Sequence, residues 1–326
     1  MRHNYPKATM LSLLAICLLS LLIALKSGSV AVGWQDLWQI ISGGENEWRE
    51  LVLKLRLPRA MAALVTGAML ALAGSLMQVL LRNPLADPYI MGVSGGAAFA
   101  ALGAMLLGVA ATFIPVAAFI GALSSILLVF AVSRGSGPWS STRMLLSGVV
   151  LAAGWGALIS LILALGPDNS LRGMLFWLMG DLSNASVPLA VWIAFPILLL
   201  LLMLRSRSLN ILALGEVTAA ALGENTKQLG WFIYLLASLL TAMAVSIAGS
   251  IGFVGLIIPH AMRLLISSDH RLLLPASALT GGSFLILADT LARTVAAPLQ
   301  LPVGVITALT GVPLFLYLLH RARVQT

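Results

Sequence analysis

Charged residues are scarce in this sequence. Only 9% of its 326 residues are Asp, Glu, Lys or Arg, whereas an ordinary soluble domain has about 25%. So few charges could not cover the surface of a soluble globule of this size. The sequence is also 60% hydrophobic, and its apolar runs are continuous instead of alternating with polar residues. Together these features exclude a soluble enzyme, a disordered chain and a disulfide scaffold, and they predict an all-α polytopic membrane protein.

Cysteine and lysine are rare as well, and each shortage removes a class of site. Cys17 is the single cysteine, so no intrachain disulfide can form, and its place in the first apolar run favours a small apolar residue that faces lipid or a neighbouring helix. None of the four lysines lies in a G-x-x-x-x-G-K-[ST] pattern, so the chain has no phosphate-binding loop. We therefore predict that the chain is not an ATPase and that a partner must supply the energy for any active transport.

Ionisable residues are nearly absent from the centres of the apolar runs. Asp289 is the clear exception, and Arg293, four residues later, predicts an i,i+4 ion pair. His260 follows Pro259 in a short run, and its position favours a packed or capping histidine over a metal ligand. No chain of carboxylates crosses the predicted bilayer, which argues against a proton- or sodium-coupled carrier.

The apolar runs predict about ten transmembrane helices. We expect the first to be an uncleaved anchor, because it lacks a good cleavage site, and the eighth to be short or partly re-entrant. Ten spans put both termini on one side. If that side is the cytoplasm, 12 basic residues lie inside and 7 outside, which the positive-inside rule favours. The predicted spans, within a single domain of residues 1–326, are 10–26, 60–81, 92–110, 114–133, 144–165, 187–204, 230–249, 251–266, 272–292 and 303–320.

Small residues recur at every fourth position in several predicted spans. Residues four apart share a helix face, and small ones let two helix backbones approach closely within a membrane. Such a stripe indicates either tight packing or one wall of a wide passage. One stripe contains Gly67 and another contains Gly96; the third consists of Gly148, Ala152, Gly156, Ser160 and Ala164.

Two segments near the ends of the spans indicate contacts with partners. In the longest cytoplasmic loop, about 205–230, Gly215 and Gly223 flank a short predicted helix. Because so short a helix is marginal alone in water, it must pack on this protein or on a cytoplasmic partner. Arg56 and Arg59 begin the second span, where a helix N-terminus disfavours each positive charge by about 0.3–1 kcal/mol. They either snorkel toward lipid headgroups or dock a carboxylate-bearing extracytoplasmic partner.

Six stretches together resemble the permease subunits of type II ATP-binding-cassette importers for iron chelates and vitamin B12. The resemblance implies two similar or identical permeases, two cytoplasmic ATPases that use ATP and Mg²⁺, a binding protein outside, and no cofactor on this chain. It places the chain in a bacterial cytoplasmic (inner) membrane. The stretches, in order, are Arg56–Arg59, Asn83–Pro88 with Gly92–Ser94, Ser141–Gly148, Leu212–Glu216 with Ala221–Gly223, Gly252–His260 and Leu301–Gly304.

The resemblance also implies roles for particular residues. The inner gate is expected at Ser141 and Thr142, the pathway lining on the fifth span at Gly148, Ala152, Gly156 and Ser160, and the docking of the binding protein at Arg56, Arg59 and Arg293. The ATPase contact is expected at Leu212, Leu214, Gly215, Glu216, Ala219, Leu222 and Gly223.

The sequence leaves alternatives open for the cargo and for the class of function. A ferric siderophore is favoured as cargo, with cobalamin and haem open. A passive channel or secondary carrier without an ATPase, and a membrane scaffold or sensor without a transport path, are the alternatives from other classes.

Overall fold

The described residues fold into helices joined by turns and loops. The computed structural model describes residues 6–28, 30–133, 141–183 and 185–323. In chain order the elements are α1 (Pro6–Lys26), α2 (Trp34–Ile41), η1 (Leu51–Arg56), α3 (Leu57–Leu80), η2 (Pro88–Met91), α4 (Val93–Leu106), η3 (Ala111–Phe113), α5 (Ile114–Ser133), α6 (Ser141–Leu165), α7 (Asp168–Leu178), α8 (Leu189–Leu204), α9 (Ser206–Ala213), α10 (Glu216–Ala221), α11 (Thr226–Ala248), α12 (Val254–Leu265), α13 (His270–Thr294) and α14 (Val303–Arg323).

Every predicted span coincides with one of these helices. Within the described ranges, six helical segments are long and apolar enough to cross a membrane, and the bent pair α8 and α9 makes a seventh candidate. The other three predicted spans correspond to α4, α12 and α14, whose apolar parts are shorter. The structure therefore confirms a polytopic helical membrane protein, while ten complete crossings stay a prediction.

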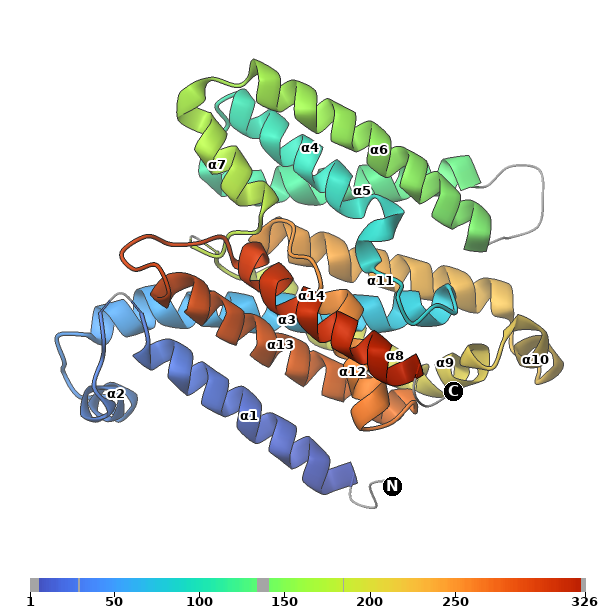
Figure 1. Cartoon of the computed structure of the whole chain (residues 1–326), viewed down its shortest axis with the longest axis horizontal. Helices are drawn as coiled ribbons and strands as arrows, with labels where there is room; N and C mark the ends of the chain where they lie inside the picture. Colours follow the sequence, from blue (N-terminus) through green and yellow to red (C-terminus); the bar gives the residue numbers. More distant parts are fainter. Residues whose placement is uncertain (1–5, 29, 134–140, 184, 324–326) are drawn as a thin grey trace.

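Helix α3 runs through the middle of the molecule and packs against α11 and α13 (Figure 1). Nearly all of its residues from Arg59 to Leu80 are buried. Glycines allow this close packing, because a Cβ on Gly67 would overlap the carbonyl oxygen of Gly281 in α13, and a Cβ on Gly74 would overlap that of Gly255 in α12. Tight packing, one of the two readings of the small-residue stripes, is thus confirmed for the stripe that contains Gly67.

Helices α4, α5 and α6 form a second group at one side of the molecule (Figure 1). A Cβ on Gly96 of α4 would lie 2.5 Å from the carbonyl oxygen of Gly121 in α5, so this stripe is also a packing seam. Ser125 of α5 donates to the Gly92 carbonyl at 2.8 Å and accepts the indole N–H of Trp155 in α6 at 3.0 Å. These bonds fix one side of α6, whereas most of its length is left uncovered by this chain.

The two ends of the bundle carry different elements. Helix α2 lies at one end, and α9 and α10 lie at the other, toward which the first residues of α1 and the last helical residues of α14 also point (Figure 1). This arrangement fits the prediction that both termini share a side. That this side is the cytoplasm stays a prediction.

Candidate functional site

A buried ion cluster lies at the end of the bundle that carries α2. Arg59, in the first turn of α3, donates its Nε and Nη2 to the carboxylate of Asp289 in α13 at 2.8–3.0 Å, and its Nη1 to Gln300 Oε1 at 2.8 Å. The Nε of Arg293 lies 3.1 Å from Asp289 Oδ2, which confirms the predicted ion pair. Arg59 is a partner that local spacing could not reveal, because it lies 230 residues away in sequence.

Arg56 and Arg293 cover the C-terminal end of α1. Arg56 Nη1 donates to the carbonyl oxygens of Leu25 at 2.7 Å and Lys26 at 2.8 Å, and Arg293 Nη2 donates to that of Ala24 at 3.2 Å. The last carbonyls of a helix have no partner within the helix and carry a partial negative charge. The negative end of α1 therefore stabilises the charges of Arg56 and Arg293. The predicted cost of a positive charge at a helix start does not apply to Arg56, because η1 continues directly into α3 and the helical segment begins at Leu51.

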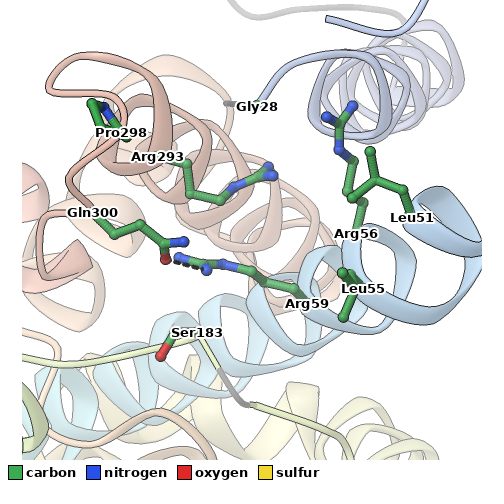
Figure 2. A pocket seen from close by; sticks show the side chains of 9 residues that line it. All are labelled: Gly28, Leu51, Leu55, Arg56, Arg59, Ser183, Arg293, Pro298 and Gln300. Carbon is green, nitrogen blue, oxygen red and sulfur yellow. Dashed lines mark hydrogen bonds between the residues drawn. The ribbon is translucent and has the colours of Figure 1, made fainter. Parts of the chain in front are cut away.

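The three predicted docking arginines are buried. Arg56 is 4% exposed, and Arg59 and Arg293 are each 8% exposed, so snorkelling toward headgroups is wrong as an explanation. Their side chains line a cleft of about 200 Å³, together with Gln300 and Ser183 among others (Figure 2). The docking role stays a prediction, and the geometry adds a condition to it: a partner's carboxylate must reach into this cleft.

The predicted coupling segment, residues 205–230, contains two short helices at the opposite end of the bundle. Helix α9 bends away from α8 by 56°, and α10 lies between Gly215 and Gly223 as predicted. Gly215 has a φ of +114° and Gly223 a φ of +86°, a backbone region that favours glycine. These two residues therefore set where α10 begins and ends.

Burial divides the predicted ATPase-contact residues into two groups. Leu212 and Ala219 are buried and hold the segment on the bundle. Leu214 and Leu222 are 67% and 60% exposed, and Val217, which the sequence analysis did not single out, is 86% exposed. Successive residues turn by about 100° in a helix, so Val217 lies roughly opposite Ala219 and faces away from the bundle. The segment thus presents an apolar surface of Leu214, Val217 and Leu222, near the part-buried Glu216 and the exposed Gly223.

Polar contacts also hold the coupling segment in shape. Ser208 in α9 donates to Glu224 Oε1 beyond α10 at 2.9 Å, which closes the segment on itself. Glu216 Oε1 lies 4.0 Å from Nη2 of Arg82, a residue in the turn that follows α3. These contacts pair residues from different elements, so a reading of local spacing did not predict them.

The predicted pathway stripe on α6 is divided between packing and open space. Gly148 is buried, and a Cβ there would lie 2.7 Å from the Ile90 carbonyl oxygen, so its assignment as pathway lining is corrected to a packing position. Ala152 is part-buried. Gly156 and Ser160 are exposed, and a Cβ on Gly156 would meet nothing within 4 Å. The open part of the stripe is therefore its second half.

Two further predictions have different outcomes. Ser141 and Thr142 begin α6, but their side chains lie outside the described part of the structure, so the gate stays a prediction. His260 is 8% exposed within α12, which confirms a packed histidine and excludes a cap, because the residue lies inside the helix.

Comparison with known proteins extends these observations. Residues 16–321 match the FecCD transport family. The chain is 38% identical to the hemin transport system permease protein HmuU of Yersinia pestis, over 98% of this chain and 97% of that protein. It is 39% identical to the Fe(3+) dicitrate permease protein FecD of Escherichia coli, over 93% and 95% of the two chains. It is also 39% identical to the vitamin B12 permease protein BtuC of Vibrio vulnificus, over 97% and 95%.

A solved structure supports the same relationship. A metal-chelate type ABC transporter in an inward-facing conformation matches with a TM-score of 0.85 and 32% identity, over 97% of this chain and 99% of that one. The similarity therefore covers the whole bundle as well as the separate motifs.

Proposed function

This chain belongs to the FecCD transport family, and we propose that it carries a ferric siderophore across a bacterial cytoplasmic membrane. As a member of that family it is an integral membrane permease subunit of a type II ATP-binding-cassette importer for iron chelates, haem or vitamin B12, and not an enzyme. Within the proposal, the functional unit is a homodimer of this chain with two cytoplasmic ATPases and an extracytoplasmic binding protein. ATP and Mg²⁺ bind to the ATPase subunits, and the chain itself holds no cofactor.

The observation that carries the proposed partnership with an ATPase is the apolar surface on the coupling segment. Val217 is exposed on α10, and the exposed Leu214 and Leu222 directly follow α9 and α10, which the bundle supports from one side. Exposed apolar patches rimmed by polar residues mark protein–protein or membrane contacts. The polar pairs beside this patch, Ser208 with Glu224 and Glu216 with Arg82, favour a protein partner over lipid. The segment leaves the membrane-spanning bundle at α8, so a cytoplasmic ATPase that binds here can move the helices through it.

A first experiment tests this contact. Val217→Asp should prevent co-purification of the ATPase subunit, because a charge would replace an apolar side chain at the interface. Gly215→Val should have a similar effect, because a β-branched residue is strained at a φ of +114°. Gln35→Asp, on exposed α2 at the other end, is the control and should co-purify normally. Normal co-purification with both coupling-segment variants would overturn the assignment.

The arginine cleft is the proposed docking site of the binding protein. Arg56, Arg59 and Arg293 lend the cleft positive charge, and a partner's carboxylate could bind there in competition with Gln300 for Arg59. Association should therefore weaken as the salt concentration rises, because opposite charges that meet near water are screened. The interior Asp289 must remain paired throughout, so the partner can displace Gln300 from Arg59 but leaves the ion cluster intact.

The cargo is tested by uptake into proteoliposomes that contain the complete transporter. Labelled ferrichrome, ferric citrate, haemin and cyanocobalamin are compared, each with its cognate binding protein and internal Mg-ATP. ATP-dependent uptake of ferrichrome supports the siderophore proposal, and uptake of haemin or cyanocobalamin alone replaces it. Uptake that needs no ATPase would instead favour the passive channel or secondary carrier.

A further inference from the structure

Asn210 links the coupling segment to the beginning of α13. It lies on α9, and its Nδ2 donates to Asp269 Oδ1 at 2.7 Å. Its Oδ1 accepts the backbone N–H of His270 at 2.8 Å and lies 2.6 Å from His270 Nδ1. Asp269 is also the N-cap of α13 and accepts the N–H of Arg271 at 2.9 Å. One amide side chain thus makes three contacts with the N-terminus of a helix 60 residues further along the chain.

The chemistry of these groups fixes the orientation of the amide. Partial burial acts to raise the pKa of Asp269, but hydrogen bonds from Arg271 and Asn210 hold that pKa below its ordinary value. The ionised carboxylate can only accept, so the NH₂ group of Asn210 must face it. The amide oxygen then faces His270, whose Nδ1 must carry a proton to donate to it. Every atom of the contact therefore has a defined role as donor or acceptor.

The helix that Asn210 holds reaches the outer ion cluster. Helix α13 is a single helix from His270 to Thr294, with Pro275 in its second turn, and is about 37 Å long at 1.5 Å per residue (Figure 1). Near its far end, Asp289 and Arg293 join Arg59 in the buried cluster. The coupling segment and the cleft at the opposite end are thus connected through one helix that is held at both ends by charged or polar contacts.

We propose that Asn210 is a positioning residue for energy coupling, which fixes the coupling segment to α13 so that movements of the segment reach the outer cleft. The proposal rests on the proposed function, in which the ATPase binds the coupling segment. Leu209 and Leu212 are buried beneath the same segment and keep α9 on the bundle without Asn210. Loss of the Asn210 contacts should therefore leave the ATPase contact in place and remove the transmission of movement.

Exchanging the donor and the acceptor between Asn210 and Asp269 tests the role of this pair. Asn210→Asp puts two carboxylates face to face and should break the link. Asn210→Asp combined with Asp269→Asn exchanges the two roles, so that position 269 supplies the donor and position 210 the acceptor. This double variant should restore the link between α9 and α13. Asp269→Asn alone is the matched control, because an amide oxygen can still accept from both Asn210 and Arg271.

The readout is a fluorescent label at the outer end of α13. The label is attached at Val295→Cys, an exposed position next to the last turn, in a Cys17→Ser background and in the complete transporter in nanodiscs. Trapping the ATPase with Mg-ATP and vanadate should change the emission of the label. Asn210→Asp should lose this change while the ATPase still co-purifies and hydrolyses Mg-ATP, and the exchanged double variant should regain it.

The outcomes separate this inference from the proposed function. A signal change that persists in Asn210→Asp, that fails to return in the double variant, or that is missing in the unsubstituted chain overturns the role of Asn210. Val217→Asp in the same assay addresses the ATPase contact alone. If Val217→Asp and Gly215→Val both still bind the ATPase and respond to trapping, the proposed function of the segment fails, whatever the Asn210 variants do.

Discussion

Asp289 is a buried carboxylate, 1% exposed, between two buried guanidinium groups. A charge so far from water is tolerated only where opposite charges and hydrogen bonds replace the water. The two arginines also depend on Asp289, because each would otherwise be a cation without a counter-ion inside the bundle. At the scale of single residues, the end of the bundle that carries α2 therefore depends on this one side chain.

Asp289→Asn should destabilise the protein strongly. The substitution leaves the charges of Arg59 and Arg293 buried without a counter-ion, and breaking a buried pair in this way costs about 3–5 kcal/mol. Unfolding of the detergent-solubilised chain, followed by tryptophan fluorescence, measures the effect. Glu50→Gln is the control, because it removes an exposed ion pair with Lys54 and should leave the unfolding midpoint unchanged. Equal midpoints for Asp289→Asn and the unsubstituted chain would contradict the structural role.

A second carboxylate, Asp87, should make stability depend on pH. Burial raises the pKa of Asp87 from 3.8 to about 6, although the N–H of Tyr89 donates to it at 2.7 Å. A carboxyl group whose pKa rises on folding favours the folded state below its unfolded pKa, and this contribution is lost as the pH rises through the folded pKa. The relevant window is therefore about pH 4–6.

Asp87→Asn should remove this pH dependence. The amide oxygen can still accept from Tyr89, so the variant and the unsubstituted chain should unfold alike at the acidic end of the window. Above pH 6 the variant should be the more stable of the two, because it has no buried charge. Thermal unfolding midpoints measured from pH 4 to pH 8 check this. A difference between the two proteins that stays constant with pH would contradict it.

At the scale of the elements, helix contacts through glycine hold the bundle together. Lipid offers no hydrophobic drive for helices to associate, so the contact must come from close approach of the backbones. Gly67 and Gly74 on α3 provide it toward α13 and α12, and Gly96 on α4 toward α5. Periodicity alone identified two of these seams as candidate packing faces, but which helix each one meets depends on the fold.

Gly74→Ala should destabilise the bundle by about 1–3 kcal/mol or more, because the new methyl group would overlap the backbone of Gly255. Gly154→Ala is the matched control. It also replaces a helical glycine, but its Cβ would meet nothing within 4 Å, so stability should be unchanged or slightly higher. Unfolding midpoints of the two variants test the difference. If the two substitutions had equal effects, the close approach would not be a constraint.

The coupling segment shows what local signals can and cannot predict. Gly215 and Gly223 mark the ends of α10 in the sequence, because positive φ values favour glycine. Helix α9 was not predicted as a separate helix, because its first residues, Ser206 to Ser208, are polar and the apolar residues that follow form only a short run. The 56° bend between α8 and α9 is not marked by a proline or glycine at the junction. The position of α9 is set instead by the packing of Leu209 and Leu212 on the bundle.

At the scale of the whole molecule, α6 has a side that this chain leaves uncovered. Two copies related by a twofold axis would bring the same surface of each together. The exposed small residues Gly156 and Ser160 then leave room between the copies for a bulky cargo. This arrangement is the proposed passage, with the gate of Ser141 and Thr142 at the first turn of α6.

Gly156→Leu should block transport and leave ATPase assembly intact, because a large side chain would fill the passage. Gly154→Leu is the control: its position is also open, but two residues away it faces nearly the opposite side of α6, so transport should continue. Uptake and co-purification are measured together. Normal uptake by Gly156→Leu would show that this face of α6 does not line the passage.

Cysteines at position 141 or 142 test the gate. They should crosslink between the two copies in some nucleotide states and not in others, because a gate must open and close during each transport cycle. Crosslinking that is independent of nucleotide would remove the gate assignment.

The sequence by itself determined the membrane class, the positions of the helices that match the predicted spans, the limits of α10 and the Asp289–Arg293 pair. All of these follow from composition or from spacing within one helix, which a linear sequence contains directly. Only the tertiary structure decided that Arg59 joins Asp289, that Gly148 packs while Gly156 stays open, and that Val217 is exposed. The physical reason is that burial and pairing depend on which distant helix covers a given face, and periodicity defines a face without naming its neighbour.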